Sequence, residues 1–252
     1  MKMLAGYNWK ELFAKVKVSR PIYYVLSGSH LYGFNSPDSD IDIRGAHCEE
    51  LYGVIGLRRE KEVLELTEGD LDFVSFELRK ELQLILSNNS NVLEHLAAPT
   101  LYKSKHYPQL RSLAERSLSK LVAKPYWGIA QFNTHKYLRT SNESYRENPL
   151  KKYLYVIRSY MAGIHALEKH RIEPNLKKLN KMRMFQISVV DELIEKKVDG
   201  LEKMTIPACK EADETIDKLM KMFASSEESS TLPPSPLIYE EANKFLIRMR
   251  MG

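Results

Sequence analysis

Short apolar runs of strand length alternate with short helical patterns over the first hundred residues. Residues 9–16 carry apolar side chains at helical spacing, which predicts a short amphipathic helix. Residues 21–26 form an apolar run rich in β-branched and aromatic side chains, bounded by a proline and by Gly28, which predicts a buried strand. Residues 40–43 alternate between polar and apolar side chains, as a half-buried strand does.

Two more strands and two short helices complete this half of the chain. Residues 62–66 and 71–76 predict the strands of a small hairpin, and residues 47–57 before them predict a loop. From residue 77 the apolar spacing becomes helical. After an Asn- and Ser-rich break, a second short helix is predicted before Pro99.

The second half of the chain has helical spacing almost throughout. Helices are predicted at residues 107–123, 126–140, 150–169, 176–195, 211–222 and 238–249. A stretch rich in Ser, Glu and Pro before the last helix predicts a linker. The sequence therefore predicts an α+β fold. A mixed sheet with helices at residues 1–100 is followed by an all-helical domain at 101–224, a linker at 225–236 and a C-terminal helix at 237–252.

Composition narrows the class of protein. With 252 residues, 43% of them hydrophobic and 28% charged, the chain can form one large or two modest globular domains. It contains no apolar stretch near the roughly 20 residues of a membrane span, and residues 1–9 lack the apolar core of a signal peptide. We therefore expect a cytoplasmic protein with no membrane partner. Cys48 and Cys209 lie far apart, outside any zinc-binding spacing, and predict reduced thiols.

The segment after the first strand carries the candidate chemistry. Gly28 has no Cβ, so a phosphate can approach its backbone, and the Ser29 hydroxyl can donate to phosphate oxygens. Asp40 and Asp42 project from one face of the next strand, roughly 6–7 Å apart. Carboxylates so close favour Mg²⁺ or Mn²⁺, and two such ions about 3.5–4 Å apart would serve phosphoryl chemistry. Arg44, at the end of this strand, is either a phosphate contact or an exposed strand-end arginine.

Two joined motifs carry a family resemblance. The pattern G-S-x-x-Y-G at residues 28–33, followed by S-D-x-D at 39–42, resembles the nucleotidyltransferase superfamily of DNA polymerase β. Within it the chain is most similar to the RlaP (YcgL-like) branch, which is associated with RNA repair. That branch carries a third aspartate on a strand and an Asn-rich segment that ends in Val-Leu-Glu, matched here by residues 70–76 and 88–94. The chain departs from it at Ser90, where the family pattern has proline.

The resemblance assigns further site residues. Asp72 alternates with apolar residues inside its strand and matches the family pattern for the third carboxylate, a metal ligand and possible general base, while Asp70 in the preceding turn is the alternative. Helices of this kind in relatives bind the triphosphate, which nominates Lys151, Lys152 and Arg158 on the helix at 150–169. An ordinary solvated helix face is the other interpretation of these three residues.

The predicted reaction transfers a nucleoside monophosphate from a nucleoside triphosphate (NTP) to an acceptor hydroxyl, with release of pyrophosphate. Asp40, Asp42 and Asp72 would bind Mg²⁺, and the resemblance implies an RNA end as acceptor. The net charge of +5 is compatible with an RNA partner and does not demand one. Two alternatives stay open: an enzyme that modifies a protein or a small molecule, of the toxin, antitoxin or AMPylating type, and a nucleotide-binding sensor without catalysis.

Overall fold

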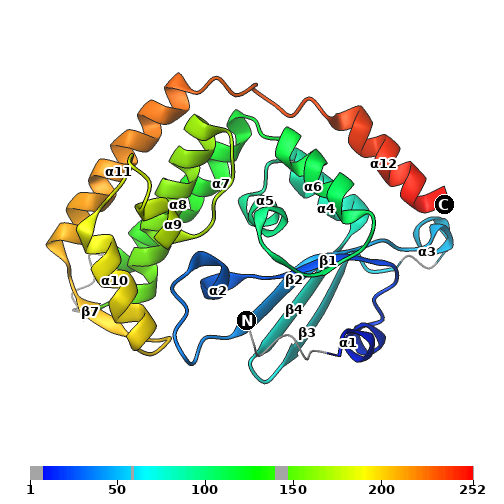
Figure 1. The fold of residues 1–252 in the computed structure, drawn as a ribbon, viewed down its shortest axis with the longest axis horizontal. Helices are drawn as coiled ribbons and strands as arrows, with labels where there is room; N and C mark the ends of the chain where they lie inside the picture. Colours follow the sequence, from blue (N-terminus) through cyan, green and yellow to red (C-terminus); the bar gives the residue numbers. More distant parts are fainter. Residues whose placement is uncertain (1–7, 58–59, 140–146, 252) are drawn as a thin grey trace.

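The protein, described here from a computed structural model over residues 8–57, 60–139 and 147–251, is built around a five-stranded sheet (Figure 1). The strands are β1 (Pro21–Leu26), β2 (Ile41–His47), β3 (Val63–Glu68), β4 (Leu71–Glu77) and β5 (Thr100–Lys103). Their order is β3-β4-β2-β1-β5. In this sheet β2 and β4 pair in parallel and the other neighbouring strands pair antiparallel, so the sheet is mixed, as expected for the predicted α+β fold.

Helices cover both faces of the sheet. In the first half they are α1 (Trp9–Val16), α2 (Gly28–Tyr32), α3 (Leu51–Ile55), α4 (Leu78–Leu86), α5 (Ser90–Ala97) and α6 (Tyr107–Arg116). Alternation along β1 explains the layers, because Tyr23 and Val25 join the large core that includes α4, α5 and α6, whereas Tyr24 packs with α1 on the other face. Figure 1 shows α4, α5 and α6 on one side of the sheet and α1 on the other.

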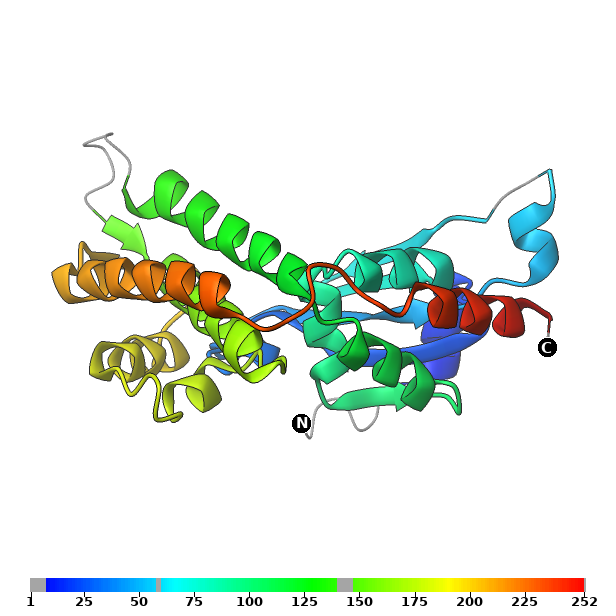
Figure 2. The same ribbon diagram turned by 90° about the horizontal axis from the view of Figure 1, so that it is seen from above.

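The second half is helical. It consists of η1 (Lys120–Val122), α7 (Ala123–Asn133), the π-helical turn η2 (Thr134–Leu138), α8 (Leu150–Lys169), α9 (Leu176–Asn180), α10 (Ser188–Asp199), α11 (Lys210–Ser229) and α12 (Tyr239–Met251), with a two-stranded ribbon of β6 (Glu147–Pro149) and β7 (Thr205–Pro207). The central helix α8 is buried along most of its length between α7, α10 and α11 (Figure 2). No helix in the described parts of the chain is long and apolar enough to cross a membrane.

Several boundaries differ from the prediction. The stretch expected as one helix at 176–195 is two helices, because the Asn180 side chain bonds the backbone N–H and C=O of Ile187 and stabilises a turn between them. Helix α11 continues to Ser229, into the segment expected as linker, since Phe223 is buried and Ser226 donates to Glu168. The predicted loop at 47–57 contains α3, and the short edge strand β5 was not predicted.

Candidate active site

Strand register places two aspartates side by side. In the parallel pair of β2 and β4, Asp42 is the direct partner of Asp72. Neighbouring strands lie about 4.8 Å apart, so the two carboxylates share one face of the sheet. Their neighbours Ile43 and Phe73 are buried on the opposite face. Asp70 lies one step outside β4, where its carbonyl accepts from the backbone N–H of Ile41 at 2.8 Å. Geometry therefore places Asp72, and not Asp70, beside Asp42.

Gly28 lies directly against the Asp42 carboxylate. The backbone N–H of Ser27 donates to the carbonyl of Asp42 at 2.8 Å, which ties the end of β1 to β2. Gly28 has a φ of +60°, and a Cβ at this position would stand 2.1 Å from Oδ2 of Asp42. The residue begins the short helix α2, and Ser29 in that helix is buried. Glycine is thus required here on both backbone and steric grounds.

Negative charge accumulates at this point of the sheet. Asp40 precedes β2 and is exposed. Burial raises the pKa of the Asp42 carboxyl above its ordinary value, and the nearby charges of Asp72 and Asp40 raise it further, while Arg44 opposes them. A cation bound between these side chains would relieve this repulsion.

Arg44 supplies one such cation. Its Nη2 donates to Oδ1 of Asp42 at 2.9 Å and to Oδ2 of Asp72 at 2.7 Å, and its Nη1 donates to the carbonyls of Asp72 and Ile43 at 2.6 and 3.1 Å. The sequence contained a signal for this position. Arg44 follows Asp40 and Asp42 at a spacing of two residues, which places all three side chains on the same face of a strand. Sequence analysis left its role open, and the structure places it between the two aspartates.

The carboxylates fit a hard divalent cation. Oxygen donors are those that Mg²⁺ and Mn²⁺ prefer. Both side chains are partly exposed, by 27% for Asp42 and 41% for Asp72, so an ion can reach them from solvent. Within residues 8–57, 60–139 and 147–251, no three His, Cys, Asp or Glu side chains lie close enough to form a ready-made metal site. A cation placed between Asp42 and Asp72 would have to displace the Arg44 guanidinium, which bridges these two carboxylates.

Lys151 is the predicted phosphate-binding residue that lies nearest this charge cluster. Burial lowers its pKa, but Tyr155, Glu202 and Asp42 outweigh that effect and raise it overall. The ammonium forms an ion pair with Glu202, which also binds Lys197 at 2.8 Å. Glu202 in turn accepts from Ser39 at 3.0 Å, so the loop before Asp40 is tied to the helical half.

Lys152 and Arg158 lie in different surroundings from Lys151. The Nζ of Lys152 stands over the ring of Tyr137 at 4.2 Å from its centroid. Arg158 is 1% exposed, donates to Glu94 at 2.6 Å, and stacks on the ring of Tyr32 at 3.6 Å. Glu94 also accepts from Tyr126 at 2.9 Å. The structure thus places Arg158 in the core beneath α2, paired with Glu94 and closed to solvent.

His95 was not singled out from the sequence, yet it lies behind the strand end that leads to Gly28. Its Nε2 and the Ser27 hydroxyl are 2.9 Å apart, and both side chains are buried. Burial lowers the pKa of His95 to about 3, and the positive charge of Arg44 adds to the effect. The imidazole is therefore neutral at physiological pH and holds Ser27 through a hydrogen bond.

A basic surface adjoins the other end of α2. Asn175, the N-cap of α9, donates to the carbonyl of Leu31 at 3.3 Å and packs against Gly33. Leu176, Leu179 and Asn180 bury one face of α9. The exposed cations of this region, called here the α9 basic face, are Lys177, Lys178, Lys181 and Arg183. Lys178 pairs with Glu173 at 3.6 Å, and residues 174–190 contain no acidic residue, so the other three cations have no acidic neighbour within that stretch of sequence.

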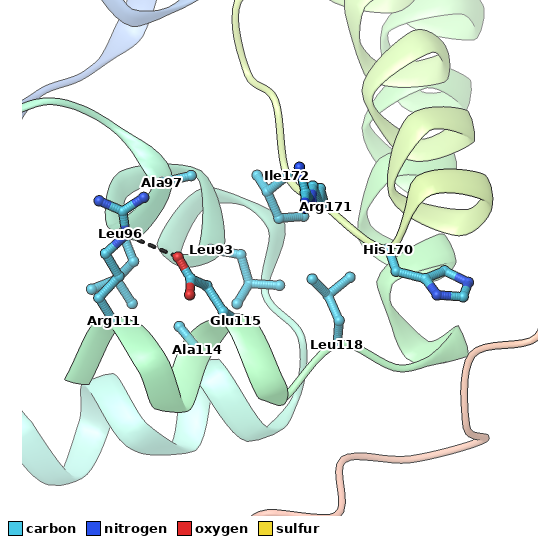
Figure 3. Close-up of a pocket in the computed structure, with 10 residues that line it drawn as sticks. All are labelled: Leu93, Leu96, Ala97, Arg111, Ala114, Glu115, Leu118, His170, Arg171 and Ile172. Carbon is cyan, nitrogen blue, oxygen red and sulfur yellow. Dashed lines mark hydrogen bonds and ion pairs between the residues drawn. The ribbon is translucent and has the colours of Figure 1, made fainter. Parts of the chain in front are cut away.

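A cavity of about 410 Å³ lies elsewhere, between α5, α6 and the segment after α8 (Figure 3). Its lining includes Leu93, Leu96, Arg111, Leu118, Arg171 and Ile172. Arg111 is paired with Glu115 at 3.0 Å, as the dashed line in Figure 3 shows. None of the residues predicted from the sequence lines this cavity, so it is distinct from the carboxylate site.

Comparisons with known proteins identify the family of the chain. A family model described as "RlaP: RNA repair pathway DNA polymerase beta family" matches residues 8–248. The chain is 33% identical over 218 residues to Uncharacterized protein MJ0002 of Methanocaldococcus jannaschii, covering 84% of this chain and 82% of that protein. It is 32% identical over 157 residues to Uncharacterized protein YcgL of Bacillus subtilis, covering 61% of this chain and 58% of that protein. The family match extends through both the sheet and the helical half.

Proposed function

The chain belongs to the RlaP family, the RNA repair pathway DNA polymerase β family, as its two joined motifs predicted; on that premise we propose that it is a Mg²⁺- or Mn²⁺-dependent nucleotidyltransferase. It transfers a nucleoside monophosphate from an NTP to a hydroxyl at the end of an RNA and releases pyrophosphate. The observation that carries the proposal is the pairing of Asp42 with Asp72 on adjacent parallel strands, directly against Gly28. A cytoplasmic location is part of the same proposal.

The roles follow from the positions of the side chains. Asp40, Asp42 and Asp72 would hold two divalent ions, which supply charge neutralisation for the attacking and leaving oxygens. Asp72, the more exposed of the two paired aspartates, accepts the proton of the acceptor hydroxyl as the hydroxyl oxygen bonds to the α-phosphorus. The bond from that phosphorus to the pyrophosphate oxygen breaks in the same displacement. Gly28 and Ser29 adjoin the phosphates, and the absence of a side chain on Gly28 lets them approach the carboxylates.

Basic side chains serve binding. Lys151, whose charge already acts on Asp42, is the first candidate to contact the triphosphate, and Lys152 lies next to it on α8. Arg158 supports the site from beneath by holding Tyr32 and Glu94. The α9 basic face supports an RNA acceptor, because four exposed cations begin where Asn175 contacts α2.

The test is incubation of the pure protein with each α-labelled NTP and Mg²⁺, with and without total RNA, followed by a gel scored for label on RNA and on protein. We expect label on RNA, lost in Asp42→Asn. Label on protein alone would replace the RNA acceptor with a protein acceptor. NTP binding without any label would favour the sensor and contradict the proposed reaction.

A further inference from the structure

We propose that Arg44 takes the place of the metal between Asp42 and Asp72 in the nucleotide-free protein, and that it turns to the phosphates of the NTP when the metal binds. The inference rests on the proposed function and adds Arg44 to the residues that take part in it. Arg44 is then both a competitor of the free metal ion and a contact for the metal-bound nucleotide. These two effects have opposite signs, which makes the proposal testable.

The contacts of Arg44 are divided between two kinds of partner. Nη1 is fixed by main-chain carbonyls, whereas Nη2 donates to one carboxylate oxygen of Asp42 and one of Asp72. A single guanidinium nitrogen therefore bridges the two side chains that would ligate the metal. A metal ion and this nitrogen cannot occupy the same space, so one excludes the other.

Either cation, the Arg44 guanidinium or a metal ion, can compensate the negative charge of the aspartates. Without a cation, Asp42 and Asp72 would lie side by side with Asp40 nearby, and like charges at this range repel. Arg44 compensates that repulsion before the metal arrives. Once a divalent ion binds the carboxylates, Nη2 of Arg44 loses both of its acidic partners, and only the main-chain carbonyls bound by Nη1 remain. The triphosphate supplies new partners, because phosphate oxygens accept from guanidinium in paired hydrogen bonds.

Access permits the movement. The Arg44 side chain is 18% exposed, and the two carboxylates are open to solvent on the same side. An arginine side chain rotates about several single bonds, so its guanidinium can move by several ångströms without any change in β2.

The ion pair of Lys151 differs from that of Arg44. Lys151 is paired with Glu202, an acidic residue that does not belong to the metal site. Arg44 differs, because its acidic partners are the predicted metal ligands themselves.

The experiment measures two affinities of the same variants. Mn²⁺ binding without nucleotide is followed by electron paramagnetic resonance, and binding of a non-hydrolysable NTP analogue with Mg²⁺ is followed by calorimetry. In Arg44→Gln we expect Mn²⁺ to bind at least about tenfold more tightly, since a neighbouring positive charge is removed, and the analogue to bind about tenfold more weakly. Arg44→Lys, which keeps the charge but not the bridge, should lie between the two proteins.

Controls separate this inference from the proposed function. Arg79→Gln removes an arginine paired with Glu62 outside the site and should leave both affinities unchanged. Thermal melting checks that each variant is folded. Asp72→Asn should lose Mn²⁺ binding. If it does, but Arg44→Gln binds Mn²⁺ no more tightly than the unaltered protein, the role of Arg44 is wrong and the metal site stands. If Asp72→Asn binds Mn²⁺ as well as the unaltered protein, both the metal site and the role of Arg44 fail.

Discussion

Gly28 is the residue on which the carboxylate site depends most directly. Its α-carbon packs so close to Asp42 that a methyl group would meet the carboxylate at 2.1 Å. The sequence predicted the need for glycine from the approach of a phosphate. The structure adds a second reason, contact with the aspartate behind it, which no spacing along the chain reveals because the contact joins the start of α2 to a different strand.

This contact leads to a prediction for Gly28→Ala. The new Cβ displaces Asp42, so we expect nucleotidyl transfer to fall at least about a hundredfold, on the scale of losses caused by misplaced reacting groups. Gly69→Ala is the matched control, because Gly69 has nearly the same backbone angle, a φ of +57°, but nothing within 4 Å of its Cβ position. Gly69→Ala should lower the free energy of unfolding by about 1–2 kcal/mol, because alanine is disfavoured at this backbone angle. The variant should keep its activity. Equal activities in the two variants would contradict the steric argument.

Arg158 shows where reasoning from single residues ended. The resemblance to relatives nominated it for the phosphates together with Lys151, seven residues earlier on the same helical face. Only the beginning of α8 borders the site. Farther along, other helices surround α8, and Arg158 meets Glu94 in the core. Helical spacing gives the face of a side chain but not the point at which neighbouring elements cover that face.

At the scale of elements, the buried pair of Arg158 and Glu94 joins α8 to α5. Tyr32 from α2 and Tyr126 from α7 complete the cluster, so it connects α2 and α5 with α7 and α8 of the helical half. Sequence patterns identified α5 and α8 correctly as helices. They did not identify this connection, because it depends on which helices pack together and not on the pattern within either.

Glu94→Gln tests the importance of this connection. The change leaves the Arg158 charge buried without a counter-charge, and breaking a buried pair in this way costs about 3–5 kcal/mol. Urea unfolding followed by circular dichroism measures that loss. Glu241→Gln is the control, because it breaks an exposed pair with Arg116, worth at most about 1 kcal/mol. A loss below about 1 kcal/mol in Glu94→Gln would show that the pair does not hold the two elements together.

At the scale of the whole molecule, sequence predicted the order of the parts well and their boundaries less well. The mixed sheet and the helical half follow from periodicity, and the third aspartate of the family pattern, Asp72, lies on a strand as expected. The sequence did not predict that this strand would be the neighbour of the strand that carries Asp42. The turn at 181–187, which ends α9, could not be predicted. Its cause is a pair of side-chain bonds from Asn180 to Ile187, and such bonds compete with a helix that the apolar spacing alone would continue.

The α9 basic face gives a prediction for RNA. Replacing Lys177, Lys178 and Lys181 together by alanine should weaken binding of single-stranded RNA at least about tenfold. It should also reduce the slope of log affinity against log salt by about 2, because each lost phosphate contact removes about 0.7. NTP binding should not change. Fluorescence anisotropy of a labelled oligonucleotide measures both quantities.

The control for this prediction lies on α11, at the outer side of the helical half (Figure 1). Its exposed lysines Lys210, Lys218 and Lys221, changed together to alanine, remove the same charge from a helix that also carries acidic residues. If both triple variants lose RNA affinity equally, the effect is one of net charge. The α9 basic face would then have no special part in binding the acceptor.

The central claim is that Asp42 and Asp72 act together as the catalytic carboxylates. The most direct measurement is the rate of label transfer from an α-labelled NTP by Asp72→Asn and by Asp70→Asn, two variants that lose the same charge at positions two residues apart. We predict that transfer by Asp72→Asn falls by at least about a thousandfold, while Asp70→Asn stays within about threefold of the unaltered protein, because only Asp72 adjoins Asp42. Full activity in Asp72→Asn, or a greater loss in Asp70→Asn, would contradict the site described here.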